Sequence, residues 1–174
     1  ALGYSIGGVV RDKDGVSALL WFCELAERLR AQGETLFDQL HRIYARSGVW
    51  RSAQASLFNP GATGIERTRA QVERLTRSKP TTLHGLRVTS TLDYREGAER
   101  RRPWLGAAAL IELSLEDQSR VLVRPSGTEP KLKIYADART SPTAGESVAA
   151  ASERAHRSAS ALAQELARWL EAEA

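Results

Sequence analysis

The chain has 174 residues, with 25 basic and 21 acidic side chains and a formal net charge of +4. This length allows one or two domains, each with a real hydrophobic core. Aromatic residues make up only 6% of the chain and none interleaves with the densest basic run, residues 100–102. We therefore expect no nucleic-acid-binding surface.

Cysteine content and hydropathy indicate the cellular compartment. The single cysteine, Cys23, rules out a disulfide within the chain, which is typical of a reducing compartment. The sequence shows neither a signal-peptide pattern nor a membrane-spanning run. We therefore expect a cytoplasmic location and no membrane partner.

The first predicted elements are a charged turn and an amphipathic helix. Residues 11–15, Arg-Asp-Lys-Asp-Gly, form the turn, with Asp14 placed to cap the helix. The spacing predicts a helix over about residues 15–32, ended by Gly33. Its apolar face is expected to consist of Val16, Leu19, Leu20, Cys23, Ala26 and Leu29. On this face Cys23 is expected to be a buried small hydrophobic residue rather than a nucleophile.

A second helix is predicted after Gly33. Thr35 and Asp38 have the spacing of a capping box, and Gly48 is a stop signal. The apolar face of this helix would hold Leu36, Leu40 and Ile43. Residues 58–64, which contain Asn-Pro-Gly and a second glycine, predict a linker. We therefore place one segment at residues 1–60 and a second domain at residues 61–174.

The second segment predicts an α+β domain, because strand patterns are flanked by helical ones. A helix is predicted to run through Ile65, Val72 and Leu75. A long Ala-rich helix is predicted from about Gly145, with Leu162, Leu166, Trp169 and Leu170 facing inward. Strands are predicted near residues 86–92, 110–115, 120–123 and 131–136. We expect these strands to form an antiparallel sheet packed against the helices.

Residues 124–133, Arg-Pro-Ser-Gly-Thr-Glu-Pro-Lys-Leu-Lys, connect the last two predicted strands and have the chemistry of a phosphate-binding loop. The Arg124 guanidinium can bind two phosphate oxygens, and Ser126 and Thr128 add hydroxyl donors. Gly127 lets backbone amides close on an anion. The alternative is an ordinary hairpin, because these are all common turn residues, but chance is a poor account of the whole run.

This run resembles the phosphate-binding loop of the α-D-phosphohexomutase family, the phosphoglucomutases and phosphomannomutases. The resemblance implies that the loop lies in the fourth and last domain and binds the phosphate of the sugar phosphate that is not reacting. The expected phosphate-binding residues are then Arg124, Ser126, Gly127, Thr128 and Lys133. No catalytic residue and no metal ligand is expected within this chain.

Residues 11–15 are similar to a Lys-Asp-Gly segment in the third domain of the same family, where the lysine faces the active-site cleft. The resemblance implies that Lys13 is a substrate-facing residue, and that residues 1–60 are the helical end of an α/β domain. The alternative is a solvated charged turn. For Lys131, phosphate binding and protection of a strand edge are equally supported. Glu129 is either a surface carboxylate or a group that orients Arg124 or a lysine.

The resemblance also implies what the whole enzyme does. Phosphohexomutases interconvert hexose 1-phosphate and 6-phosphate through a bisphosphate, using a phosphoserine, magnesium and a sugar-binding loop. The Thr-x-Ser-His-Asn-Pro, Asp-x-Asp-x-Asp and Glu-rich motifs for these parts do not occur here, and the chain has no Met. We therefore expect a C-terminal fragment that is inactive alone, with the sugar phosphate and the N-terminal domains as its partners.

Magnesium and a glucose 1,6-bisphosphate-type activator are expected for the full-length enzyme, and neither for the fragment itself. The sugar remains open among glucose, mannose and pentose. The alternative function is a free-standing, non-catalytic phosphate- or nucleotide-binding module.

Overall fold

The computed structural model describes residues 3–8, 10–102 and 104–172. The chain forms two compact units, Ala1–Ser47 and Gly48–Ala174. Each unit has its own secondary structure.

The first unit contains the two predicted helices, α1 (Gly15–Ala31) and α2 (Leu36–Ser47). Asp14 caps α1, because its carboxylate accepts hydrogen bonds from the amides of Val16 (3.1 Å) and Ser17 (3.2 Å). The predicted capping box precedes α2. The Asp38 amide donates to the Thr35 hydroxyl (3.2 Å), and the Thr35 amide donates to the Asp38 carboxylate (2.8 Å).

The predicted apolar face of α1 is largely exposed in this unit. Only Ala18 and Leu29 are buried on α1, and Cys23 is exposed, so the prediction of a buried Cys23 was wrong. Val16 is 80% exposed and Leu20 68%. The physical reason is that α1 and α2 are the only regular elements between residues 3 and 47 that the structure describes, and α2 buries none of its residues.

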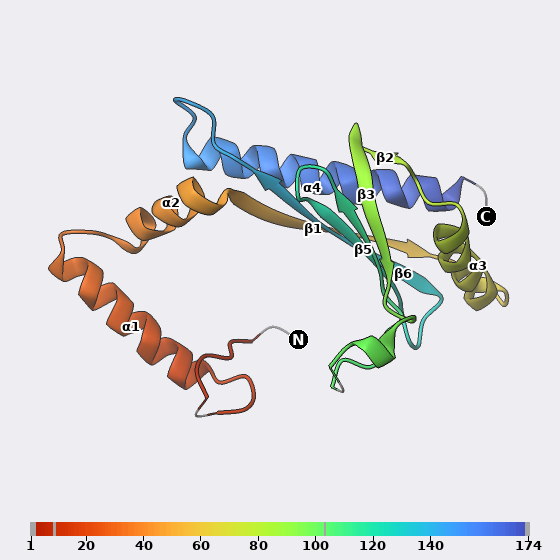
Figure 1. Ribbon diagram of the computed structural model, residues 1–174, viewed down its shortest axis with the longest axis horizontal. Coiled ribbons are helices and arrows are strands. Elements are labelled where there is room, and N and C mark those ends of the chain that lie inside the picture. Colours follow the sequence, from red (N-terminus) through yellow and green to blue (C-terminus); the bar gives the residue numbers. More distant parts are fainter. Residues whose placement is uncertain (1–2, 9, 103, 173–174) are drawn as a thin grey trace. The chain divides into compact units, whose positions relative to one another are not determined.

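The second unit is an α+β domain built on a six-stranded antiparallel sheet, as predicted (Figure 1). The strand order is β1-β6-β5-β4-β3-β2. The strands are β1 (Val49–Phe58), β2 (Thr82–Leu83), β3 (Leu86–Asp93), β4 (Ile111–Leu115), β5 (Arg120–Pro125) and β6 (Lys131–Thr140). The helices are α3 (Gly64–Arg77), the short 3-10 helix η1 (Ala98–Arg100) and α4 (Val148–Glu171).

Strand β1 was not predicted, and it belongs to the second compact unit. All ten of its residues pair with β6, from Val49 opposite Thr140 to Phe58 opposite Lys131. The units therefore divide after Ser47, whereas the sequence placed the boundary at residue 60. The segment Val-Trp-Arg-Ser-Ala-Gln-Ala-Ser-Leu-Phe is rich in small and polar residues, so its extended conformation depends on pairing with β6 rather than on its own pattern.

The core lies on one face of this sheet, against α4 and α3. Figure 1 shows α4 running along the sheet beside β1 and β6. The buried side chains include, from the strands, Val121, Val123, Leu132 and Ile134 and, from the helices, Leu75, Leu162, Leu166 and Leu170. The predicted inward face of α4 is confirmed at its leucines, while Trp169 is partly buried against the core. The opposite face of β5 and β6 is left more open, because side chains alternate along a strand.

Candidate functional site

Arg124 and Lys133 are directly opposite each other at the ends of β5 and β6 that meet the predicted loop. They project from the open face of the sheet, since Val123 and Ile134 beside them are buried on the other face. Within the described residues, neither cation makes a hydrogen bond or an ion pair. Like charges placed directly opposite on neighbouring strands repel each other, so this position attracts an anion.

The loop between these strands is closed by its own backbone. The Ser126 amide donates to the carbonyl of Lys131, and the Lys131 amide donates to the carbonyl of Glu129, both at 2.8 Å. Among the residues that the structure describes, the hydroxyls of Ser126 and Thr128 and the amides of Gly127 and Thr128 have no acceptor. The loop thus carries several donors that are available to a ligand, as an oxyanion site requires.

Gly127 leaves open space over the loop. A Cβ atom built on Gly127 would meet no heavy atom within 4 Å, so packing does not require the glycine here. The sequence predicted that its small size allows backbone amides to approach an anion, and the open space is compatible with that prediction.

The loop is anchored by residues that the sequence assigned to a linker. The Asn59 amide donates to the Pro130 carbonyl (2.8 Å). The buried Asn59 side-chain nitrogen donates to the Thr68 hydroxyl (3.0 Å) and to the Gln71 side-chain oxygen (2.9 Å), both on α3. A Cβ on Gly64 would lie 2.0 Å from the Asn59 carbonyl oxygen, so only glycine fits there. In the sequence, only the Asn-Pro-Gly segment marked this connection between β1, α3 and the loop, and it was interpreted as a linker.

Glu129 and Lys131 form an ion pair of 3.3 Å beside the loop. Of the alternatives for Glu129, the structure favours contact with a lysine over contact with Arg124. This pair occupies the Lys131 ammonium, which distinguishes it from the unpaired Lys133 on the same face of the strand.

Lys13 lies in the first unit, where its ammonium pairs with the Asp12 carboxylate at 2.7 Å. Hydrogen bonds from Lys13 lower the pKa of the Asp12 carboxyl below its usual value. The lysine side chain is 53% exposed. These features match the charged turn that was the alternative for this motif, and the substrate-facing role of Lys13 stays a prediction.

A cavity of about 250 Å³ lies between the loop and α3. Besides residues 125–129 it is lined by Ile65, Thr68, Arg69, Val72, Arg95 and Ala109. Sequence reasoning missed the two arginines, because nothing in the sequence indicates that α3 or the segment after β3 meets the loop. Arg95 is held in place by Asp93 (Nε to Oδ1, 2.9 Å) and by the Thr76 hydroxyl (3.0 Å).

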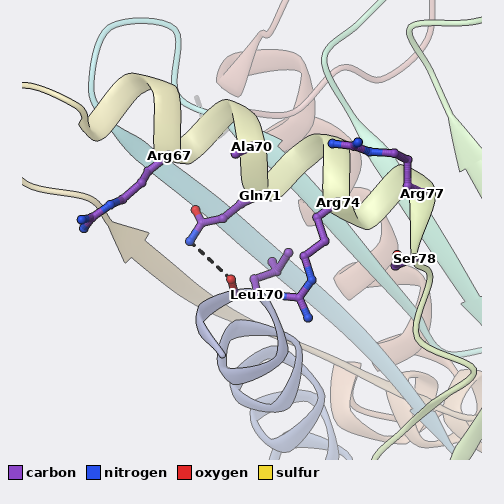
Figure 2. Close-up of a pocket in the computed structure, with 7 residues that line it drawn as sticks. All are labelled: Arg67, Ala70, Gln71, Arg74, Arg77, Ser78 and Leu170. Carbon is purple, nitrogen blue, oxygen red and sulfur yellow. Dashed lines mark hydrogen bonds between the residues drawn. The ribbon is translucent and has the colours of Figure 1, made fainter. Parts of the chain in front are cut away.

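A second arginine-rich cavity, of about 390 Å³, lies between α3 and the end of α4. Figure 2 shows Gln71 donating to the Leu170 carbonyl (3.5 Å) and the guanidinium groups of Arg67, Arg74 and Arg77 pointing in different directions. Arg74 lies over the Trp169 ring, 4.1 Å from its centroid. The three cations do not converge on one point, so this cavity is a weaker anion site than the loop.

The described residues contain no cluster of three His, Cys, Asp or Glu side chains that could hold a metal ion. No helix in the described part is long and apolar enough to span a membrane.

Comparisons with known proteins agree with this fold. Residues 96–155 match the family model of the phosphoglucomutase/phosphomannomutase C-terminal domain. The chain is similar to a probable phosphomannomutase of Haemophilus influenzae, with 34% identity over 140 residues, covering 80% of this chain and 27% of that protein. It is similar to a phosphoglucomutase of Staphylococcus haemolyticus, with 32% identity over 140 residues, covering 76% and 25%.

The chain is also similar to two further proteins. A probable phosphoribomutase of Schizosaccharomyces pombe is 34% identical over 152 residues, covering 80% of this chain and 25% of that protein. The crystal structure of Paramecium parafusin, a phosphoglucomutase, in its open form matches with a TM-score of 0.61. That match has 16% identity and covers 94% of this chain and 27% of the other, so it shows the fold alone.

The fold and these matches define a C-terminal domain of the kind found in sugar-phosphate mutases. The C-terminal region of this chain belongs to the phosphoglucomutase/phosphomannomutase family. The chain spans about a quarter of the length of the curated relatives that it matches.

Proposed function

We propose that this chain supplies the substrate phosphate-binding part of a sugar-phosphate mutase that interconverts hexose 1-phosphate and 6-phosphate. Arg124, Ser126, Gly127, Thr128 and Lys133 bind the phosphate that is not reacting. The observation that carries the proposal is the uncompensated pair of cations, Arg124 and Lys133, next to a loop of donors without acceptors.

The chemistry of a mutase explains why such a site is needed. Phosphoryl transfer depends mainly on positioning and on stabilisation of charge, so a second phosphate is a natural point of attachment. Binding energy from this remote phosphate holds the sugar in line for attack at its other end. Arg124 binds two phosphate oxygens, Lys133 binds a third, and the loop donors fix the orientation. None of these residues is the nucleophile.

Other parts of the reaction are assigned outside this chain. Magnesium stabilises the charge on the transferring phosphoryl group when it is bound. We assign no residue of this chain as a magnesium ligand. The glucose 1,6-bisphosphate-type activator is assigned to the complete enzyme. On this proposal the chain alone is inactive, and the cytoplasmic location stays a prediction.

The first unit is proposed to be the helical end of a third domain, with Lys13 facing the substrate. The exposed apolar residues of α1 support this, because a helix with such side chains is normally packed against another element. The proposed sugar is a hexose, with a pentose as the alternative that the similarity to a phosphoribomutase favours.

A titration of the 174-residue chain tests the proposal. Amide resonances would be followed by NMR during addition of glucose 1-phosphate, mannose 1-phosphate, glucose 1,6-bisphosphate and inorganic phosphate at constant ionic strength. We expect shifts at residues 126–128 that are lost in Arg124→Gln and retained in Arg87→Gln, an exposed arginine on β3. Absence of shifts in the unmodified chain, or equal shifts in both variants, would overturn the assignment.

A further inference from the structure

The cavity between α3 and the candidate loop contains an excess positive charge. Ile65, Arg69 and Val72 are spaced four and three residues apart, so one face of α3 is presented to the cavity. The loop residues Ser126 and Thr128 line the same cavity. A cation from a different element is therefore placed beside the loop hydroxyls.

The other charged groups of this cavity are already compensated. Arg95 is paired with Asp93, and Glu129 is paired with Lys131 at 3.3 Å. Arg69, by contrast, makes no hydrogen bond or ion pair within residues 3–8, 10–102 and 104–172. One arginine therefore faces the cavity without a counter-charge, beside two hydroxyls without acceptors.

We propose that Arg69 is a further anion-binding residue of this chain and contacts a phosphate group bound at the loop from the α3 side. The inference rests on the proposed function and adds a residue that does not belong to the loop. The cavity, at about 250 Å³, is smaller than pockets that typically enclose a drug-sized ligand (about 300–1,000 Å³), so it suits a single small oxyanion. A guanidinium is well matched to such a group, because it donates two parallel hydrogen bonds.

The test measures the Kd of inorganic phosphate for the 174-residue chain and its variants, at fixed ionic strength because screening changes such affinities. The readouts are the amide resonances of residues 126–128 and the side-chain Nε–H resonance of Arg69. The variants are Arg69→Gln, Arg69→Lys and Arg124→Gln. The matched control is Arg67→Gln, which removes a charge two residues away on α3, from the other cavity.

We expect Arg69→Gln to raise the Kd about three- to tenfold, Arg69→Lys to recover part of the affinity, and Arg67→Gln to change it little. Thermal unfolding of each variant checks that Arg69→Gln acts on binding and not on folding. Equal effects of Arg69→Gln and Arg67→Gln would overturn the inference.

The variants separate this inference from the proposed function. Loss of binding in Arg124→Gln with no effect of Arg69→Gln would leave the proposed function and remove Arg69 from the site. The reverse result would keep Arg69 and remove Arg124. No binding of phosphate by the unmodified chain would overturn both.

Discussion

The backbone amide of Asn59 donates a 2.8 Å hydrogen bond to the carbonyl oxygen of Pro130, which joins the end of β1 to the candidate phosphate loop. The Asn59 side chain continues this connection into α3 through Thr68 and Gln71. These contacts are buried, so their loss leaves polar groups without partners in a dry environment. The geometry of the loop thus depends on residues that lie outside it.

Replacing Asn59 tests this connection. Asn59→Ala removes both side-chain bonds and leaves the Gln71 oxygen without its donor, so we expect the free energy of unfolding to fall by about 1–3 kcal/mol. Urea unfolding of the two proteins measures the difference. Gln54→Ala, an exposed amide on β1, is the control and should change stability by less than about 0.5 kcal/mol. Equal losses in both variants would contradict the role of Asn59.

Gly64→Ala probes the close approach of α3 to the Asn59 backbone. The added Cβ would lie 2.0 Å from the Asn59 carbonyl oxygen and 2.8 Å from Pro130, so the segment must move. We expect a loss of about 1–3 kcal/mol in stability, as for other overpacked sites, with amide shifts in the loop. Gly15→Ala, in open space at the start of α1, should be neutral or slightly stabilising. A stable Gly64→Ala protein with an unchanged spectrum would be inconsistent with this packing.

Lys133→Gln should improve stability and weaken binding. Removing one of two opposed cations relieves repulsion, so we expect the ligand-free chain to gain about 0.2–1 kcal/mol. Phosphate affinity should fall in the same variant. Chemical unfolding with and without phosphate measures both effects, and Lys79→Gln serves as the control. A variant that loses stability without phosphate would argue against strain between Arg124 and Lys133.

The ion pair of Glu146 and Arg154 should make stability depend on pH. Hydrogen bonds from the Arg154 guanidinium (2.6 and 3.1 Å), followed by one from the Thr143 amide, lower the pKa of Glu146 from 4.5 to about 2. Because the folded-state pKa is depressed, this stabilisation is complete above pH 4.5 and is lost as the pH falls toward 2.

Thermal melts of Glu146→Gln across this range check the expectation. The Tm of the variant should lie below that of the unmodified chain at pH 7, and the gap should narrow between pH 4.5 and pH 2. The control Glu153→Gln removes the exposed ion pair between Glu153 and Arg157 (3.7 Å). Its Tm should differ less from that of the unmodified chain at every pH. A gap that does not change with pH would show that Glu146 acts through something other than its charge.

In a complete mutase carrying this domain, Arg124→Ala should raise KM and lower kcat. On the proposed function, the variant loses affinity for the non-reacting phosphate, and it also loses the positioning that this phosphate provides at the reacting end. Steady-state kinetics with a hexose 1-phosphate measure both constants. Unchanged constants would remove Arg124 from the site, and a change in KM alone would limit its role to uniform binding.

The sequence predicted the elements whose signals are local. The helix caps at Asp14 and Thr35 involve neighbours in the chain, and the loop of residues 124–133 carries its donors on consecutive positions. Strand β1 escaped prediction because its stability comes from a partner about eighty residues away. Arg69 escaped for the same reason, since only tertiary packing places α3 beside the loop. Cys23 was placed wrongly because periodicity indicates an apolar face but not what covers it.

The pairing of β1 with β6 has a consequence for folding kinetics. It joins residues 49–58 to residues 131–140, and contacts so distant in sequence form slowly because a long loop must close first. The anchor at Asn59 lies at the end of this ladder, so the loop donors reach their final arrangement only after the ladder has formed. In a refolding experiment, we expect helical signal to recover before the capacity to bind phosphate.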